Sequence, residues 1–340
     1  MNTNVNASNR IEWIDAAKGI GIVFVVLGHI WLIGPGPKYI SSFHMPLFFF
    51  LSGYVFKFGR YQGIGDFICD KVKHILVPYA WFSFITFGYW LLVERRLSGN
   101  GISPLSAFVN IFKCQGADQY LPHNPALWFL PCLFLVEVMF FGIAQNRKKT
   151  YIPILLLLVS IAGYFISRFI SGSFPWSINV ALIGVVFYGS GYVLGSTKKL
   201  SVSSPKLIIV GLTGAFVMGL LISLKNTYVI MAACIFGDYF YFFSAAFLNI
   251  IGILGVAVLL RNVACLVYLG RNSLVIFALH FPIKRIVMGI NGLFFNIPLE
   301  EIKASFLLSG LDTLITLLML LPFIHLIRTR FSFILGQGRS

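Results

Sequence analysis

Long apolar stretches, each close to the length that crosses a bilayer, dominate the pattern of hydrophobic and polar positions along this chain. A helix needs about 20 apolar residues to cross the hydrocarbon core, and ten stretches qualify. Membrane barrels instead show short segments of alternating polarity. The predicted spans are 14–33, 40–58, 75–93, 127–146, 151–170, 177–195, 206–224, 240–260, 268–288 and 309–327. We therefore expect an all-α, polytopic integral membrane protein, because helices satisfy their own backbone in lipid.

The composition agrees with this pattern. Hydrophobic residues make up 58% of the 340 residues and charged residues only 11%, whereas a soluble chain of this length keeps a more polar exterior. No polar segment of domain length interrupts the apolar runs, so we expect one membrane domain over residues 1–340, with its core at about 10–330. The net charge of +15 is not gathered in a basic, aromatic-rich soluble segment, so nucleic-acid binding is not predicted.

Lysine and arginine divide unevenly between the two sets of loops that ten spans create. One set carries 15 of these residues and the other carries 9, with Lys18 and Arg271 counted in neither set. Positive residues collect in cytoplasmic loops, and an even number of spans puts both ends on one side. Both termini are therefore predicted to be cytoplasmic, and the longest loop, about 94–126, is predicted to face outward.

Two kinds of processing or cross-linking are not predicted. The five cysteines are scattered, without a CxxC pair or metal-like spacing, which argues against a zinc site and a disulfide framework. The first residues, MNTNVNASNRIEW, lack the regions of a cleavable signal peptide.

The first span carries Asp15, Lys18 and His29, and ionisable residues within a span are candidates for a functional site. At ~100° per residue, Lys18 and His29 share one face of the helix, ~16 Å apart along its axis. Neighbouring helices could approach this helix closely at three glycines, Gly19, Gly21 and Gly28. A simpler interpretation stays open, in which Lys18 snorkels and pairs with Asp15 while His29 lies at the interface.

Two further histidines are predicted at a similar depth. His44 lies about four residues inside the outer end of the second span, and His280 lies in the outer half of the ninth. Imidazole can take a proton from a hydroxyl near neutral pH, so His29 and His44 are candidate catalytic residues and His280 a candidate acceptor-side residue. Three histidines could also bind zinc, but no HxxxH-type pair is present, and no metal is predicted.

Other polar residues divide by predicted depth. Lys71, Lys73 and Arg271 lie near the inner face, where they serve either as topology signals or as ligands for the phosphates of a cytosolic donor. Trp128, at a predicted interface, and Glu137, near mid-span, are candidates for the acceptor side. Glu137 fits a structural hydrogen bond to a neighbouring helix equally well. This layout suits a donor that enters from the cytosol and a base deeper in the membrane.

Five segments, in order, resemble the membrane acyltransferase-3 family. They read RIEWIDAAKGIGIVFVVLGH, SSFHMPLFFFLSGYVF, KHILVPY, ALWFLPCLF and SLVIFALHFPI. The similarity extends to the sugar O-acetyltransferase branch, including fucose 4-O-acetylase-like proteins, and covers about residues 10–330. A basic residue, ten residues and a histidine form the family's first-span signature, which Lys18 and His29 match, although many relatives have arginine at the first position.

The resemblance implies an acyl-CoA-dependent O-acyltransferase with about ten spans in the bacterial inner membrane. The donor would be acetyl-CoA or another acyl-CoA, and the acceptor a hydroxyl of a carbohydrate or lipid-linked glycan surrounded by membrane lipid. The family's essential histidine corresponds to His29, which gives Lys18 a donor-side role and His44 a positioning role. The family's basic positions before the third span map only loosely onto Lys71 and Lys73. Direct transfer and an acetyl-histidine intermediate both fit the sequence, and a homo-oligomer stays an open question.

Other classes of protein remain as alternatives. A polytopic transporter of a glycan or small molecule would share the hydropathy and the buried charges, but transporters often carry repeats, and no repeat is visible here. A purely structural membrane partner would not need histidines at one depth. A serine esterase is disfavoured because the chain has no GxSxG motif.

Overall fold

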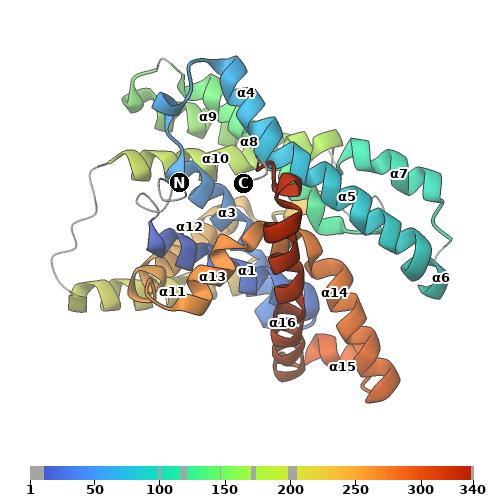
Figure 1. Ribbon diagram of the computed structural model, residues 1–340. Coiled ribbons are helices and arrows are strands. Elements are labelled where there is room, and N and C mark those ends of the chain that lie inside the picture. Colours follow the sequence, from blue (N-terminus) through green and yellow to red (C-terminus); the bar gives the residue numbers. More distant parts are fainter. Residues whose placement is uncertain are drawn as a thin grey trace, which may run out of the picture.

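The protein is helical throughout the part that this computed structural model describes, residues 11–98, 101–115, 121–145, 147–169, 174–197 and 205–337 (Figure 1). Within these ranges the one strand-like feature is an isolated bridge between Ile230 and Ile235. The predicted all-α class is therefore confirmed.

Eight helices of the described residues are long and apolar enough to cross a membrane, which makes this an integral membrane protein. They are α1 (Glu12–Ile30), a continuous helix from Ile64 to Leu97, α8 (Phe129–Ala144) with the preceding 3-10 turn η4 (Pro125–Trp128), α9 (Ile152–Phe169), α10 (Ile178–Ser196), α12 (Tyr239–Leu259), α14 (Ser273–Phe294) and α16 (Phe306–Arg330). The continuous helix consists of α4 (Ile64–Lys71), the π-helical turn η2 (Val72–Leu76), α5 (Val77–Tyr89), the π-helical turn η3 (Trp90–Glu94) and α6 (Arg95–Ser98). The remaining helices are α2 (Pro35–Ser41), α3 (His44–Val55), α7 (Pro104–Lys113), α11 (Pro205–Lys225), α13 (Ala264–Arg271) and α15 (Leu299–Ala304).

Two of the ten predicted spans differ from this picture. The stretch 40–58 is broken between α2 and α3 at Phe43, whose φ of −136° is not helical. The 12 residues of α3 extend only about 18 Å, which is short of the ~30 Å hydrocarbon core. The stretch 206–224, by contrast, coincides with α11, which is 21 residues long. The ninth predicted span, 268–288, is divided at Asn272 between α13 and α14.

Glycines allow the short helix α3 to lie deep in the protein against α10. A Cβ on Gly53 would collide with the backbone carbonyl of Tyr188, and one on Gly191 would collide with that of Phe50. The two backbones therefore approach as closely as small residues permit. The predicted close approach of a neighbouring helix to the first span is present at Gly19, where a Cβ would collide with the carbonyl of Leu266 on α13.

Contacts at the two ends of α1 show that α1 and α16 are antiparallel. Near the start of α1, Asp15 pairs with Arg271, whose backbone carbonyl accepts a hydrogen bond from Arg328 at the end of α16. Beyond the end of α1, the ring of Trp31 packs on Phe306 at the start of α16, 5.2 Å between centroids. The side of the membrane on which each end lies stays a prediction, and the termini themselves, residues 1–10 and 338–340, lie outside the described residues.

Candidate active site

A cavity of about 310 Å³ lies at the end of α1, where the chain passes through α2 into α3. His29, in the last turn of α1, lines one side of this cavity, and His44, the first residue of α3, lines the other. The remaining wall comes from α14, from η4 and from the segment 228–232, which contribute Phe277, Ala126, Trp128, Tyr228, Val229, Ile230, Met231 and Ala232. We call this space the histidine cavity.

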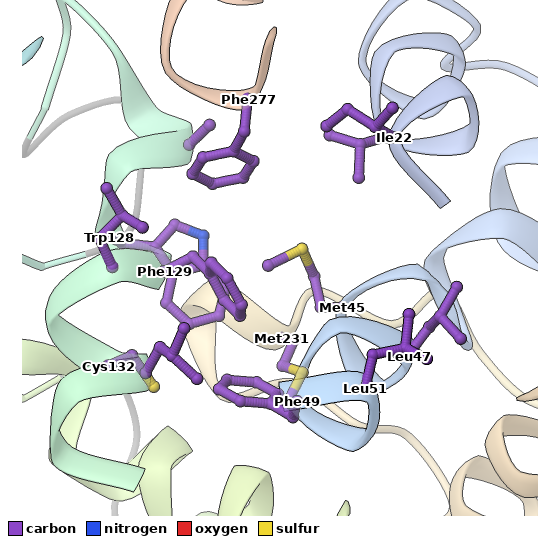
Figure 2. Close-up of a cluster of buried hydrophobic side chains, with 14 of the residues drawn as sticks. Ile22, Met45, Leu47, Phe49, Leu51, Trp128, Phe129, Cys132, Met231 and Phe277 are labelled. Carbon is purple, nitrogen blue, oxygen red and sulfur yellow. The ribbon is translucent and has the colours of Figure 1, made fainter. Parts of the chain in front are cut away.

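The apolar side of the histidine cavity is continuous with the core of the protein. Figure 2 shows Met45, Phe129, Met231 and Phe277, from different parts of the chain, converging on one hydrophobic cluster. Trp128 lies at the edge of this cluster and is 5% exposed. Such a mostly apolar cavity with a few polar groups is the usual form of a small-molecule site.

Three imidazoles meet at the cavity. The ring centroid of His29 lies 5.2 Å from that of His280 and 6.4 Å from that of His44. The Phe281 ring packs on His29 from α14 at 4.8 Å. The structure thus brings together the three histidines that the sequence predicted at one depth.

Backbone carbonyls fix the protonation pattern of two of these rings. His44 donates from Nδ1 to the carbonyl of Ile40 at 2.8 Å, and His280 donates from Nδ1 to the carbonyl of Phe277 at 2.7 Å. A carbonyl oxygen can only accept, so Nδ1 carries the hydrogen in both rings and Nε2 of the neutral ring is an acceptor. Nε2 of His280 is buried and has no hydrogen-bond partner among the described residues.

Lys284, one of the nine lysines and arginines counted with the outward-facing loops, also reaches the site. It lies inside α14, is 8% exposed, and donates from Nζ to the carbonyl of His29 at 2.5 Å. Its ammonium also lies 4.0 Å from the centroid of the Phe281 ring, a cation–π contact. The signal that could have identified it is its spacing of four residues from His280, which places both on one helix face.

The other end of α1 carries the remaining first-span residues. Asp15 accepts a hydrogen bond at 3.0 Å from Arg271, which lies on α13 and keeps 41% of its side chain exposed. Lys18 follows one turn later and is half-buried. Lys18 and His29 therefore occupy opposite ends of α1, as their spacing predicted, and Asp15 has Arg271 as its cationic partner.

The predicted donor-side and acceptor-side residues divide differently from expectation. Glu137 does not line the histidine cavity but lies 2.9 Å from Nζ of Lys71, at the far end of α3. A pocket of about 120 Å³ adjoins this pair and is also lined by Tyr61 and Tyr188. We call it the ion-pair pocket. Lys73, by contrast, is exposed.

A cluster of polar residues that packs against α14 was not among the candidates from the sequence. Arg285 of α14 donates to Glu94 at 2.5 Å and to the carbonyl of Pro122 at 3.0 Å. His123, which follows Pro122, is fully buried and lies outside the membrane-spanning segments. Burial lowers the pKa of His123 to about 3, and the nearby charge of Arg285 adds to this effect. Asn124 follows, is also fully buried, and donates to the carbonyl of Ala278 at 2.6 Å. Nothing in the sequence indicates these contacts, because they form only where the loop packs against α14.

No three His, Cys, Asp or Glu side chains of the described residues are arranged to hold a metal ion. The histidine cavity combines imidazole acceptors with an apolar chamber at the end of a membrane helix. This arrangement can remove a proton from a hydroxyl group while limiting the access of water.

Comparison with known proteins bears on the chain as a whole. Searches of the curated proteins and of the solved structures found no match. A protein-family model described as an acyltransferase domain matches residues 11–327, which includes every element of the histidine cavity. The chain therefore belongs to the acyltransferase-3 family, whose members are membrane acyltransferases.

Proposed function

We propose that this protein is a membrane O-acyltransferase that moves an acetyl or other short acyl group from acyl-CoA to a hydroxyl of a cell-envelope carbohydrate or lipid-linked glycan. The family supports acyl transfer. The single observation that carries the rest is the position of His29, whose ring borders the histidine cavity between His44 and His280.

In the proposed step, His29 takes the proton of the acceptor hydroxyl as that oxygen forms a bond to the acyl carbon. The bond between the acyl carbon and the sulfur of the thioester breaks, and the CoA thiolate leaves. An imidazole is suited to this proton transfer near neutral pH. In the competing scheme, His29 itself attacks the acyl carbon and forms an acyl-histidine intermediate before the hydroxyl arrives.

The neighbouring groups have supporting parts in this proposal. His44 positions the acceptor or the reacting carbonyl, since both it and His29 line the cavity. Trp128 contributes a broad apolar wall that suits the face of a sugar ring. His280 acts on the neighbouring ring of His29.

The donor is proposed to approach from the opposite end of α1. Lys18, Arg271 and the exposed Lys73 are the cations there that suit the phosphates of CoA. Lys71 suits them less well, because Glu137 already neutralises it. We propose a bacterial inner membrane with both termini cytoplasmic, which puts this end of α1 in reach of cytosolic acyl-CoA.

Acyl transfer to the envelope can be tested in cells. Glycans from cells with and without the protein should differ by the mass of the acyl group, and label from [¹⁴C]acetate should enter only the former. Identical glycans in both strains, with the protein shown to be expressed, would contradict the proposal.

A transporter is the rival function, and one experiment separates the two. Proteoliposomes that contain the purified protein should transfer label from acetyl-CoA to an added glycan acceptor. Flux of the unmodified glycan across the bilayer without acetyl-CoA, and without transfer of label, would support transport instead.

A further inference from the structure

A proline inside α14 leaves a backbone carbonyl without its helical partner next to the site. Pro282 has no N–H group, so the carbonyl of Ala278, four residues earlier, cannot form its usual hydrogen bond. Both residues are buried, where an unpaired carbonyl is costly. The opened turn of α14, residues 278–282, contains His280.

Asn124 supplies the missing partner from another part of the chain. Its Nδ2 donates to the carbonyl of Ala278 at 2.6 Å, and its side chain is fully buried. Backbone hydrogen bonds hold Asn124 in its turn, from its own N–H to the carbonyl of Leu121 and from the N–H of Leu127 to its carbonyl. The backbone that carries this side chain is therefore held in its turn.

The carbonyl just before this opened turn orients His280. Its Nδ1 donates to the carbonyl of Phe277 at 2.7 Å, which leaves Nε2 as a buried acceptor with no partner among the described residues. The ring centroid of His29 lies 5.2 Å away at an interplanar angle of 30°. One hydrogen bond, direct or through one water, can join groups at this separation.

We propose that Asn124 is a positioning residue for acyl transfer, because its bond to the carbonyl freed by Pro282 holds His280 with Nε2 presented to the His29 ring. An acceptor at that position takes the N–H of His29 and leaves the other ring nitrogen unprotonated. The role rests on the proposed function of His29 as the base. Lys284 fixes the backbone of His29 from the same helix, so α14 holds both the ring and its main chain.

Activity of purified protein in detergent provides the first test. Asn124→Ala should lower kcat by about 10- to 100-fold, because small displacements of a catalytic group have effects of this size, while the Michaelis constant for acyl-CoA stays unchanged. Asn124→Ala combined with Pro282→Ala should recover most of the loss, because alanine restores the N–H group that pairs with the carbonyl of Ala278. Asn179→Ala is the matched control, since it also removes a buried asparagine that bonds a backbone group but does not line the histidine cavity.

Coupling to His280 distinguishes positioning from a general loss of packing. In a His280→Ala background, Asn124→Ala should have little further effect on kcat, because the residue through which it acts is already absent. A full additional loss in that background, or no rescue by Pro282→Ala, would overturn the proposal.

Chemical modification separates this proposal from the proposed function. Diethyl pyrocarbonate reacts with an unprotonated imidazole nitrogen, and mass spectrometry reports its rate of reaction at His29. That rate should fall in Asn124→Ala and recover in the double variant, even if no acyl donor is turned over. If the enzyme is active but both kcat and the His29 rate are unchanged in Asn124→Ala, the positioning role is wrong while the proposed function stands.

Discussion

The histidine cavity and the ion-pair pocket lie at opposite ends of the same short helix, α3, and use polar groups in opposite ways. At the first end, His29 and His44 border an open volume of about 310 Å³. At the other end, Lys71 and Glu137 lie 2.9 Å apart beside a volume of about 120 Å³. The histidines face space that a ligand can enter, whereas the two charges face each other.

This difference separates groups that are available for chemistry from groups that hold helices together. A buried ion pair is weak evidence for net stability, but losing one partner leaves the other charge unpaired and is strongly destabilising. Lys71 belongs to α4 and Glu137 to α8, so their pair ties two helices that are distant in sequence. We therefore expect the first end to control activity and the second end to control folding.

The largest expected effect is on activity at the histidine end. His29→Gln removes the proposed base while keeping a polar side chain, and kcat should fall by about 10²- to 10⁴-fold, the usual contribution of a general base. Purified protein should keep its thermal unfolding midpoint. The control is His74→Gln, since His74 is exposed and contacts Asp70. Near wild-type turnover by His29→Gln would contradict the expectation that the histidine cavity, at one end of α3, controls activity.

The next effect is on stability at the ion-pair end. Lys71→Met should lower the free energy of unfolding by about 3–5 kcal/mol, because the carboxylate of Glu137, 5% exposed, loses its partner. Lys71→Met with Glu137→Leu should regain most of that stability, and the folded double variant should retain turnover. Lys73→Met, on the same stretch but exposed, is the control and should change little. A stable Lys71→Met protein with an increased Michaelis constant for acyl-CoA would instead assign Lys71 to the donor.

The smallest effect concerns acid sensitivity behind the histidine cavity. Burial holds the pKa of His123 at about 3, below its ordinary value of 6.5, so the unfolded chain binds a proton that the folded protein does not. Stability from this group is complete above pH 6.5 and is lost as the pH falls from 6.5 toward 3. Between pH 6.5 and 5 the loss should be about 2 kcal/mol.

Melting curves of wild type and His123→Phe across this range check the origin of that loss. The variant should have a shallower dependence of the unfolding midpoint on pH. Equal slopes for the two proteins would mean that the acid sensitivity arises elsewhere.

The sequence was most informative for α1, because both of its signals are local. Helical periodicity alone placed Lys18 and His29 on one stripe, and Gly19 meets a neighbouring backbone as small residues do. The agreement in depth among His29, His44 and His280 also followed from counting residues along antiparallel spans. These inferences depend only on the rise per residue of a helix, the number of residues per turn and the length of a membrane span.

Features made by tertiary contacts were not predictable in this way. Hydropathy averaged over 40–58 hides the break at Phe43 that shortens α3, although Pro46 is a local signal of it, because proline has no N–H for the carbonyl of Ser42. Lys284 was counted with the charges of the outward-facing loops although the predicted span 268–288 contains it, and the carbonyl of His29 satisfies it inside the protein. The partners of Glu137 and Asn124 lie on helices that only the folded chain brings near.

The most direct test of the central claim is the structure of the protein with a non-hydrolysable acyl-CoA analogue bound, determined by cryo-electron microscopy. The carbonyl carbon of the acyl group should lie in the histidine cavity, close enough to His29 for an acceptor hydroxyl to bridge them, with reacting atoms ~3–3.5 Å apart. An acyl group seated beside Lys71 and Glu137, or anywhere outside the histidine cavity, would contradict it.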